Sequence, residues 1–252
     1  MLDASADTDV RDSMRRTPLH YAARDGRQEV ALLLINAGAN INAVDQENST
    51  ALHFAVKNGH APIVQSLVLN GADVNVRDAD RQRTPLHYAV QNGQMEMVWM
   101  LMLGGAAIDA ADADGMTPLH LAVTNNRTNL VEVFLSSSAE VNVDVRDKQL
   151  KTPLHYAARD GIDEAATILI HNGTDLNAVD VDGNAALHFA ASNDDAALVE
   201  LLITRGAKID IENGKGETPL WQALRSGVEK VHAARVLMRY GASVDKATKV
   251  MI

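Results

Sequence analysis

The chain has 252 residues, of which 46% are apolar but only 4% aromatic, and its formal charge is -10. This acidic balance argues against a nucleic-acid-binding protein, which needs a basic patch, and the absence of cysteine excludes disulfide bonds and thiolate metal sites. The first ten residues do not resemble a secretory signal, and the longest apolar stretch, residues 98–108, is too short to cross a bilayer. We therefore expect a soluble cytoplasmic protein, with the nucleus as an alternative location.

A four-residue motif of the form Thr-Pro-Leu-His recurs along the chain. Residues 1–16 precede its first copy and parallel the segment before the third copy, since "ADTDVRDSMRRTPLH" resembles "ADVNVRDADRQRTPLH". The copies begin at Thr17, Thr50, Thr84, Thr117, Thr152, Ala185 and Thr218. Their spacings of 33, 34, 33, 35, 33 and 33 residues predict stacked supersecondary units rather than one conventional core.

Each period begins with a predicted short helix. Thr17 can cap the first one with its hydroxyl, and Pro18 at the first helical position loses no hydrogen bond. A glycine then ends the helix because glycine accepts the left-handed geometry of the C-terminus, and Asn126 and Asp194 replace it in the fourth and sixth periods. The glycines are Gly26, Gly59, Gly93, Gly161 and Gly227.

A second helix and a polar finger complete each period. Apolar residues such as Val30 and Leu34 share one stripe of this helix, because they are spaced i, i+4. A second glycine ends the helix in most periods, and Ser138 replaces it in the fourth. The residues that follow, such as "ANINAVDQENS", mix β-branched residues with Asn and Asp and predict an extended hairpin, the finger.

The motif T-P-L-H-x-A, the glycine, the apolar helix and "GADVN" at this period resemble the ankyrin-repeat family. The resemblance covers essentially the whole chain and implies an all-α repeat solenoid of helix-turn-helix units with β-hairpin fingers and a concave face. We expect a flank or partial finger at residues 1–16, seven repeats at 17–240 and a partial finger at 241–252. Solenoid ends need polar caps. Either these short flanks cover the ends or the chain is a piece of a longer protein, and we expect the second.

Six histidines at the last position of the motif could be interpreted as metal ligands or acid–base groups. The resemblance implies instead that they form hydrogen bonds between turns and neighbouring repeats. Layers about 10 Å apart also hold such rings too far apart to share one zinc ion. No phosphate-binding loop, nucleophile elbow or H-E-x-x-H helix is present, so we expect no enzyme, cofactor or metal. The histidines are His20, His53, His87, His120, His155 and His188.

Two positions beside the motif alternate between odd and even repeats. The residue before it is basic in odd repeats and uncharged in even ones, and the residue after the histidine is tyrosine only in odd repeats. The first position holds Arg16, Ser49, Arg83, Met116, Lys151 and Asn184. The second holds Tyr21, Phe54, Tyr88, Leu121, Tyr156 and Phe189.

Each alternation has two interpretations. The charges either neutralise neighbouring fingers, at about 0–1 kcal/mol for an exposed pair, or form a recognition surface with basic tips about 20 Å apart. The aromatic residues either pack between fingers and helices or form a ladder for an extended peptide.

The last residues of the first helices vary where the framework does not, which makes them candidate binding residues. They are Arg24, Asp25, Lys57, Asn58, Gln91, Asn92, Thr124, Asn125, Arg159 and Asp160. Four finger asparagines, Asn42, Asn75, Asn142 and Asn177, resemble the asparagines that are hydroxylated in ankyrin repeats. Their ordinary role is hydrogen bonding in turns.

These patterns favour a non-enzymatic protein–protein interaction module or scaffold. We expect a monomer that binds a partner protein or extended peptide on the concave face, with no nucleic acid, membrane insertion or small-molecule substrate. The alternative is a regulatory or targeting domain of a larger enzyme, channel or transcription regulator.

Overall fold

The computed structural model describes residues 7–136, 141–225 and 231–245. The chain forms two compact units, Met1–Pro118 and Leu119–Ile252. The predictions for Ser138 and Gly227 lie outside the described residues. Each finger is numbered here with the motif that it precedes, so that Asp12 belongs to repeat one and Asp45 to repeat two.

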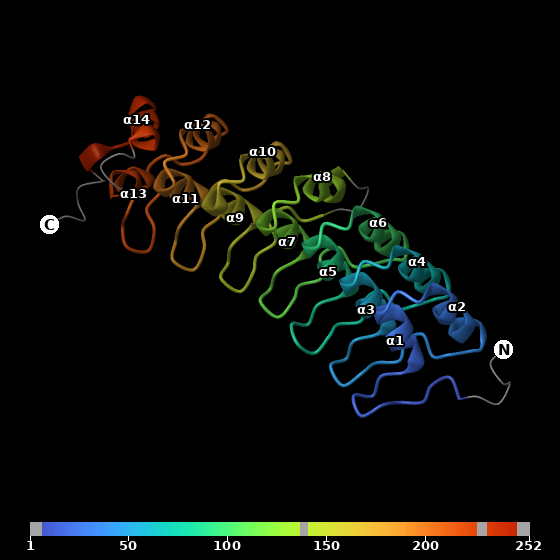
Figure 1. The fold of residues 1–252 in the computed structure, drawn as a ribbon. Coiled ribbons are helices and arrows are strands. Elements are labelled where there is room, and N and C mark those ends of the chain that lie inside the picture. Colours follow the sequence, from blue (N-terminus) through green and yellow to red (C-terminus); the bar gives the residue numbers. More distant parts are fainter. Residues whose placement is uncertain (1–6, 137–140, 226–230, 246–252) are drawn as a thin grey trace. The chain divides into compact units, whose positions relative to one another are not determined.

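The first unit contains three pairs of helices. Within it, the first helices of successive repeats contact one another, as do the second helices. Both sets can be followed from blue to green in Figure 1. The helices are α1 (Pro18–Arg24), α2 (Gln28–Asn36), α3 (Ala51–Lys57), α4 (Ala61–Leu69), α5 (Pro85–Gln91) and α6 (Met95–Leu103).

The second unit continues the same alternation of first and second helices, with α9, α11 and α13 in contact in order and α8, α10, α12 and α14 likewise. Its helices are α7 (Pro118–Thr124), α8 (Thr128–Ser136), α9 (Pro153–Asp160), α10 (Asp163–His171), α11 (Ala186–Ser192), α12 (Ala196–Thr204), α13 (Pro219–Arg225) and α14 (His232–Arg239). The predicted all-α repeat class is therefore confirmed, and α7 begins at the last residue of the first unit.

Each repeat buries a thin apolar layer. In repeat one, Leu19, Ala22 and Ala23 of α1 are buried, together with Ala31 and Leu34 of α2. The small alanines let the two helices approach closely, and burying one leucine contributes about 1.5–3 kcal/mol. Because a pair of helices cannot cover both of its sides, this layer depends on the neighbouring repeats.

The motif histidines connect successive repeats. The backbone N–H of Thr17 donates to Nδ1 of His20 over 3.1 Å. A backbone amide can only donate, so Nδ1 is unprotonated and Nε2 carries the proton. Nε2 then donates to the carbonyl of Ser49 in the next repeat over 3.0 Å. The predicted structural role of this histidine is confirmed.

The motif threonine lies at the N-cap of the first helix, as expected, and forms a capping box with the histidine three residues later. In repeat one, Thr17 Oγ1 lies 2.9 Å from the His20 ring nitrogen. In repeat seven Trp221 replaces the histidine, and Thr218 Oγ1 there accepts the Trp221 backbone N–H over 3.3 Å.

The fingers are turns rather than strands. The Asp45 N–H donates to the Ser49 carbonyl within its finger, and the Gln46 N–H donates to Met14 of the preceding finger, both over 3.0 Å. No strand occurs in the described ranges. The predicted hairpin is therefore reduced to a closed loop with one backbone hydrogen bond to its neighbour.

Candidate functional site

The inner row is the set of six side chains that follow the motif histidines: Tyr21, Phe54, Tyr88, Leu121, Tyr156 and Phe189. Leu121 and Tyr156 are buried and the other four are half-buried. The Phe54 ring meets His20 of the preceding repeat edge-on at 5.7 Å. The row thus packs between repeats, as one of the two interpretations expects, and its role in binding stays a prediction.

The tyrosine hydroxyls of the inner row are already hydrogen-bonded. Each donates to the finger aspartate of its own repeat, and the pairs are Tyr21–Asp12, Tyr88–Asp78 and Tyr156–Asp147. Burial, followed by the hydrogen bond to Asp78, raises the pKa of Tyr88 above its usual range. Its hydroxyl is therefore a proton donor at neutral pH.

Two of the three basic residues before the motif, Arg16 and Arg83, reach the next finger. Arg16 Nε lies 3.3 Å from Oδ2 of Asp45, and Arg83 Nε lies 3.0 Å from Oδ2 of Asp112. Arg83 is only 7% exposed, so its guanidinium is not a free tip. These two pairs agree with neutralisation between neighbouring fingers.

Another arginine in repeats one, three and five also binds the following finger. Its guanidinium donates to a backbone carbonyl, in the pairs Arg11–Val44, Arg77–Ala111 and Arg146–Val179, at 3.3, 2.5 and 3.5 Å. Each odd finger is thereby attached through its arginines to the even finger after it. The two-repeat pattern of the sequence has a structural basis.

The two alternations are complementary. In repeat two, Asp45 Oδ1 accepts the backbone N–H groups of Glu47 and Ser49, both over 2.9 Å, which leaves Oδ2 for a side chain. In odd repeats that side chain is the tyrosine of the same repeat. In repeats two and four, which have no tyrosine, it is the arginine of the preceding repeat.

Repeat six is the exception. Asp180 is 3% exposed, and its Oδ2 has no hydrogen-bond partner. Phe189 offers no hydroxyl, and Lys151, at the position of Arg16, donates to Gln149 Oε1 over 2.8 Å instead. Oδ2 of each of the other finger aspartates is bound by a tyrosine or an arginine side chain, and Asp180 has neither.

The ends of the first helices carry exposed charges on aromatic rings. The repeated decapeptide "TPLHYAARDG" builds the same cluster twice, because the arginine lies over the tyrosine and binds the next aspartate over 2.7 Å in both copies. The arginine carbons lie 4.7 and 4.6 Å from the ring centroids. The two clusters are Tyr21–Arg24–Asp25 and Tyr156–Arg159–Asp160.

The other predicted helix-end residues differ in their contacts. The Lys57 ammonium lies 4.2 Å from the Tyr88 ring centroid and 3.4 Å from the Asp78 carboxylate. Asn92 is exposed. The side chains of the remaining residues form hydrogen bonds with nearby groups. The pairs are Asn58–Phe54 carbonyl, Gln91–Arg83, Thr124–His120 carbonyl and Asn125–Leu121 carbonyl. Arg24, Lys57 and Arg159 remain as solvent-accessible cations.

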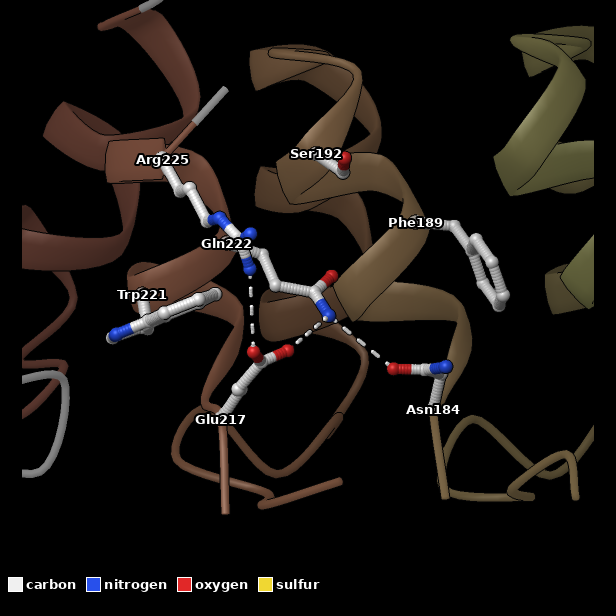
Figure 2. Close-up of a pocket in the computed structure, with 7 residues that line it drawn as sticks. All are labelled: Asn184, Phe189, Ser192, Glu217, Trp221, Gln222 and Arg225. Atoms are coloured by element: carbon white, nitrogen blue, oxygen red, sulfur yellow. Dashed lines mark hydrogen bonds and ion pairs between the residues drawn. The ribbon is translucent and has the colours of Figure 1, made fainter. Parts of the chain in front are cut away.

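A hollow lies between repeats six and seven (Figure 2). Gln222 occupies the inner-row position of repeat seven, and its Nε2 lies 3.3 Å from Asn184 Oδ1 and 3.4 Å from Glu217 Oε2. Arg225 lies 3.6 Å from the buried Glu217 carboxylate. The hollow is lined by Asn184, Phe189, Ser192, Glu217, Trp221, Gln222 and Arg225. Sequence analysis missed Gln222 and Arg225, although the repeat spacing places them in register with Tyr21 and Arg24.

Three of the four finger asparagines form a ladder between repeats. Asn42 and Asn75 are exposed and Asn177 is half-buried, and their Oδ1 atoms each accept a backbone N–H of the next repeat over 2.8 Å. Asp144 makes this contact in repeat five, to Asp175. The placement of Asn142 at the same position is therefore wrong, because the two extra residues of this period shift it to a turn where its Oδ1 accepts the Asp144 N–H.

No group of three or more metal-ligating side chains comes together among the described residues. Within the same residues, none of the helices has the length and hydrophobicity needed to span a bilayer.

Comparisons with known proteins agree with this geometry. A family model for ankyrin repeats (3 copies) matches residues 1–78, 40–112, 86–180 and 154–248. The chain is 41% identical to neurogenic locus notch homolog protein 1 of Mus musculus over 109 residues, which are 42% of this chain and 4% of that protein. It is 34% identical to B-cell lymphoma 3 protein homolog of Mus musculus over 131 residues, which are 51% of this chain and 29% of that protein.

A solved structure matches over most of the chain. The crystal structure of the human ASB11 ankyrin repeat domain superposes with a TM-score of 0.76 and 28% sequence identity. The match covers 90% of this chain and 99% of that domain. The curated relatives are much longer than the segments that the chain matches in them.

Proposed function

Because the chain belongs to the ankyrin-repeat family, whose members are generally protein–protein interaction modules, we propose that it binds a protein partner along its first helices and fingers. The role is binding rather than catalysis. Within each unit, the partner segment lies in extended form across the inner-row residues and the ends of the first helices.

The observation that carries this proposal is the placement of Arg24, Lys57 and Arg159. Each cation is exposed, and its charged group lies over a ring of the inner row and beside an aspartate, which fixes the position of the charge. A charge held in this way loses little conformational entropy when it pairs with a partner carboxylate. Such charges would orient the partner and speed its association.

The test is affinity capture with the intact chain from its native cell, repeated with charge-reversal variants. Arg24→Glu combined with Arg159→Glu is expected to lose the captured partner. Arg235→Glu, which changes another exposed arginine, on the second helix α14, is the control and should retain it. If the double variant still captured the partner and Arg235→Glu did not, the proposal would be wrong and the binding surface would lie on the second helices.

A further inference from the structure

Asp180 is held in the same geometry as the finger aspartates that bind arginine. Its Oδ1 accepts the backbone N–H groups of Asp182 and Asn184 over 3.0 and 2.9 Å. The equivalent oxygen of Asp45 has the same two kinds of partner. Both side chains are almost fully buried, at 3% and 2% exposure. The turn therefore fixes the direction of the second carboxylate oxygen in both fingers.

The aromatic neighbour is also the same. In repeat two, the Phe54 ring meets the edge of His20 at 5.7 Å, and the guanidinium carbon of Arg16 lies 5.2 Å from the ring centroid. In repeat six, Phe189 meets the edge of His155 at 6.1 Å. The carboxylate and the ring that receive Arg16 in repeat two are thus both present in repeat six.

Only the guanidinium is absent from repeat six. The Lys151 ammonium binds Gln149, and Asp180 Oδ2 is left buried without a donor. A buried carboxylate oxygen without a hydrogen bond is unfavourable. A donor that enters from another molecule would remove that cost.

We propose that Asp180 and Phe189 form a receptor for an arginine side chain of the partner, which takes the place that Arg16 occupies in repeat two. A guanidinium suits both the Phe189 ring and the Asp180 carboxylate, because it is planar, stacks on an aromatic ring and donates N–H groups to a carboxylate. Phe189 also borders the hollow of Figure 2, on the side of α11 away from Glu217 and Gln222. This inference rests on the proposed function and names one chemical feature of the partner.

The first experiment uses the intact chain and a short polyalanine peptide with one central arginine. Binding is followed through the backbone amide NMR signals of Asp182 and Asn184, which donate to Asp180. Saturable shifts are expected with arginine. The same peptide with citrulline, which has a similar shape but no charge, should bind at least about tenfold more weakly.

Two variants close or remove the receptor without removing the turn. Lys151→Arg supplies the guanidinium from within the chain, and Asp180→Asn keeps the Oδ1 acceptor while it removes the charge. Both are expected to abolish the arginine-specific shifts, and thermal unfolding checks that each variant is folded. Arg16→Ala is the converse variant. It should open a second receptor, seen as new shifts at Glu47 and Ser49.

Shifts that are equal for arginine and citrulline, absent in the unaltered chain, unaffected by both closing variants, or absent at Glu47 and Ser49 in Arg16→Ala would overturn the proposal. The outcome is separable from the proposed function. A captured partner that is lost with Arg24→Glu and Arg159→Glu but retained by Lys151→Arg and Asp180→Asn would leave the binding surface in place and eliminate the arginine receptor.

Discussion

Arg83 of repeat three and Asp112 of the next finger form a buried ion pair, with Nε and Oδ2 separated by 3.0 Å. The Arg83 guanidinium also donates to Gln91 Oε1 over 2.8 Å. Both partners of the ion pair are removed from water, so neither charge can be lost alone at low cost. Of the two arginine–aspartate pairs between fingers, Arg83–Asp112 is shorter and more deeply buried than Arg16–Asp45.

Removal of the arginine should therefore destabilise the fold. Arg83→Ala leaves Asp112 charged and buried, and a decrease of about 3–5 kcal/mol in the free energy of unfolding is expected. Urea denaturation measures it. The exposed Arg24, changed to alanine, is the control and should change stability far less. Similar values for the two variants would contradict the buried pair.

A hydroxyl placed on Phe189 should stabilise repeat six. Phe189→Tyr supplies Asp180 with the donor that Tyr156 supplies to Asp147, and a gain of about 0.5–1.5 kcal/mol is expected. Phe54→Tyr is the matched control, because Asp45 is already bound to Arg16. The melting temperatures of the two variants give the comparison. An equal rise in melting temperature in both variants would show that Asp180 does not lack a hydrogen-bond donor.

The motif histidines should make the fold sensitive to acid. Burial lowers the pKa of His53 and of His87 to about 4, against about 6.5 in an unfolded chain. Each ring is neutral in the fold, so its contribution is complete above pH of about 6.5 and is lost as the pH falls towards 4. The loss amounts to about 3 kcal/mol for each of these two histidines.

The measurement is the free energy of unfolding from pH 7.5 downward, together with NMR titration of the histidine rings. Burial and Asp195 raise the pKa of Asp163 to about 6, which gives a dependence of opposite sign, so the series is run in an Asp163→Asn background. Protonation of His53 near pH 6 without unfolding would contradict the assigned hydrogen bonds.

The asparagine ladder gives a positional prediction. Asn75→Ala removes the bond from the Ala107 N–H and the bond to the Gly105 carbonyl, at 2.8 and 3.0 Å, and a loss of about 1–3 kcal/mol is expected for the two. Asn142→Ala removes one local turn bond and should cost less. Chemical denaturation of both variants decides whether Asn142 belongs to the ladder.

The repeat framework could be predicted because each of its residues has a local reason. Gly26 has a φ of 72°, and its replacements Asn126 and Asp194 have φ values of 52° and 62°. Asn and Asp are the residues that tolerate this left-handed region best after glycine. Local backbone chemistry of this kind can be read from the order of residues alone.

The partners of the finger aspartates could not be predicted in the same way. Both alternations were visible, but nothing in the sequence says that Arg16 extends to the following finger while Tyr21 folds back to its own. That choice depends on side-chain direction across two repeats. The shift of Asn142 had a readable signal, since the ladder residue always stands three positions before the finger aspartate.

The linkage of odd to even fingers has a consequence for how such an array can change in length. If repeat three were deleted, Ser49 would come to face Asp112, whose own repeat carries Leu121, and that carboxylate would have neither arginine nor tyrosine. Deletion or duplication of two consecutive repeats restores every pairing. The smallest block that preserves the pairings is therefore two repeats, and the decapeptide shared by repeats one and five recurs after two such blocks.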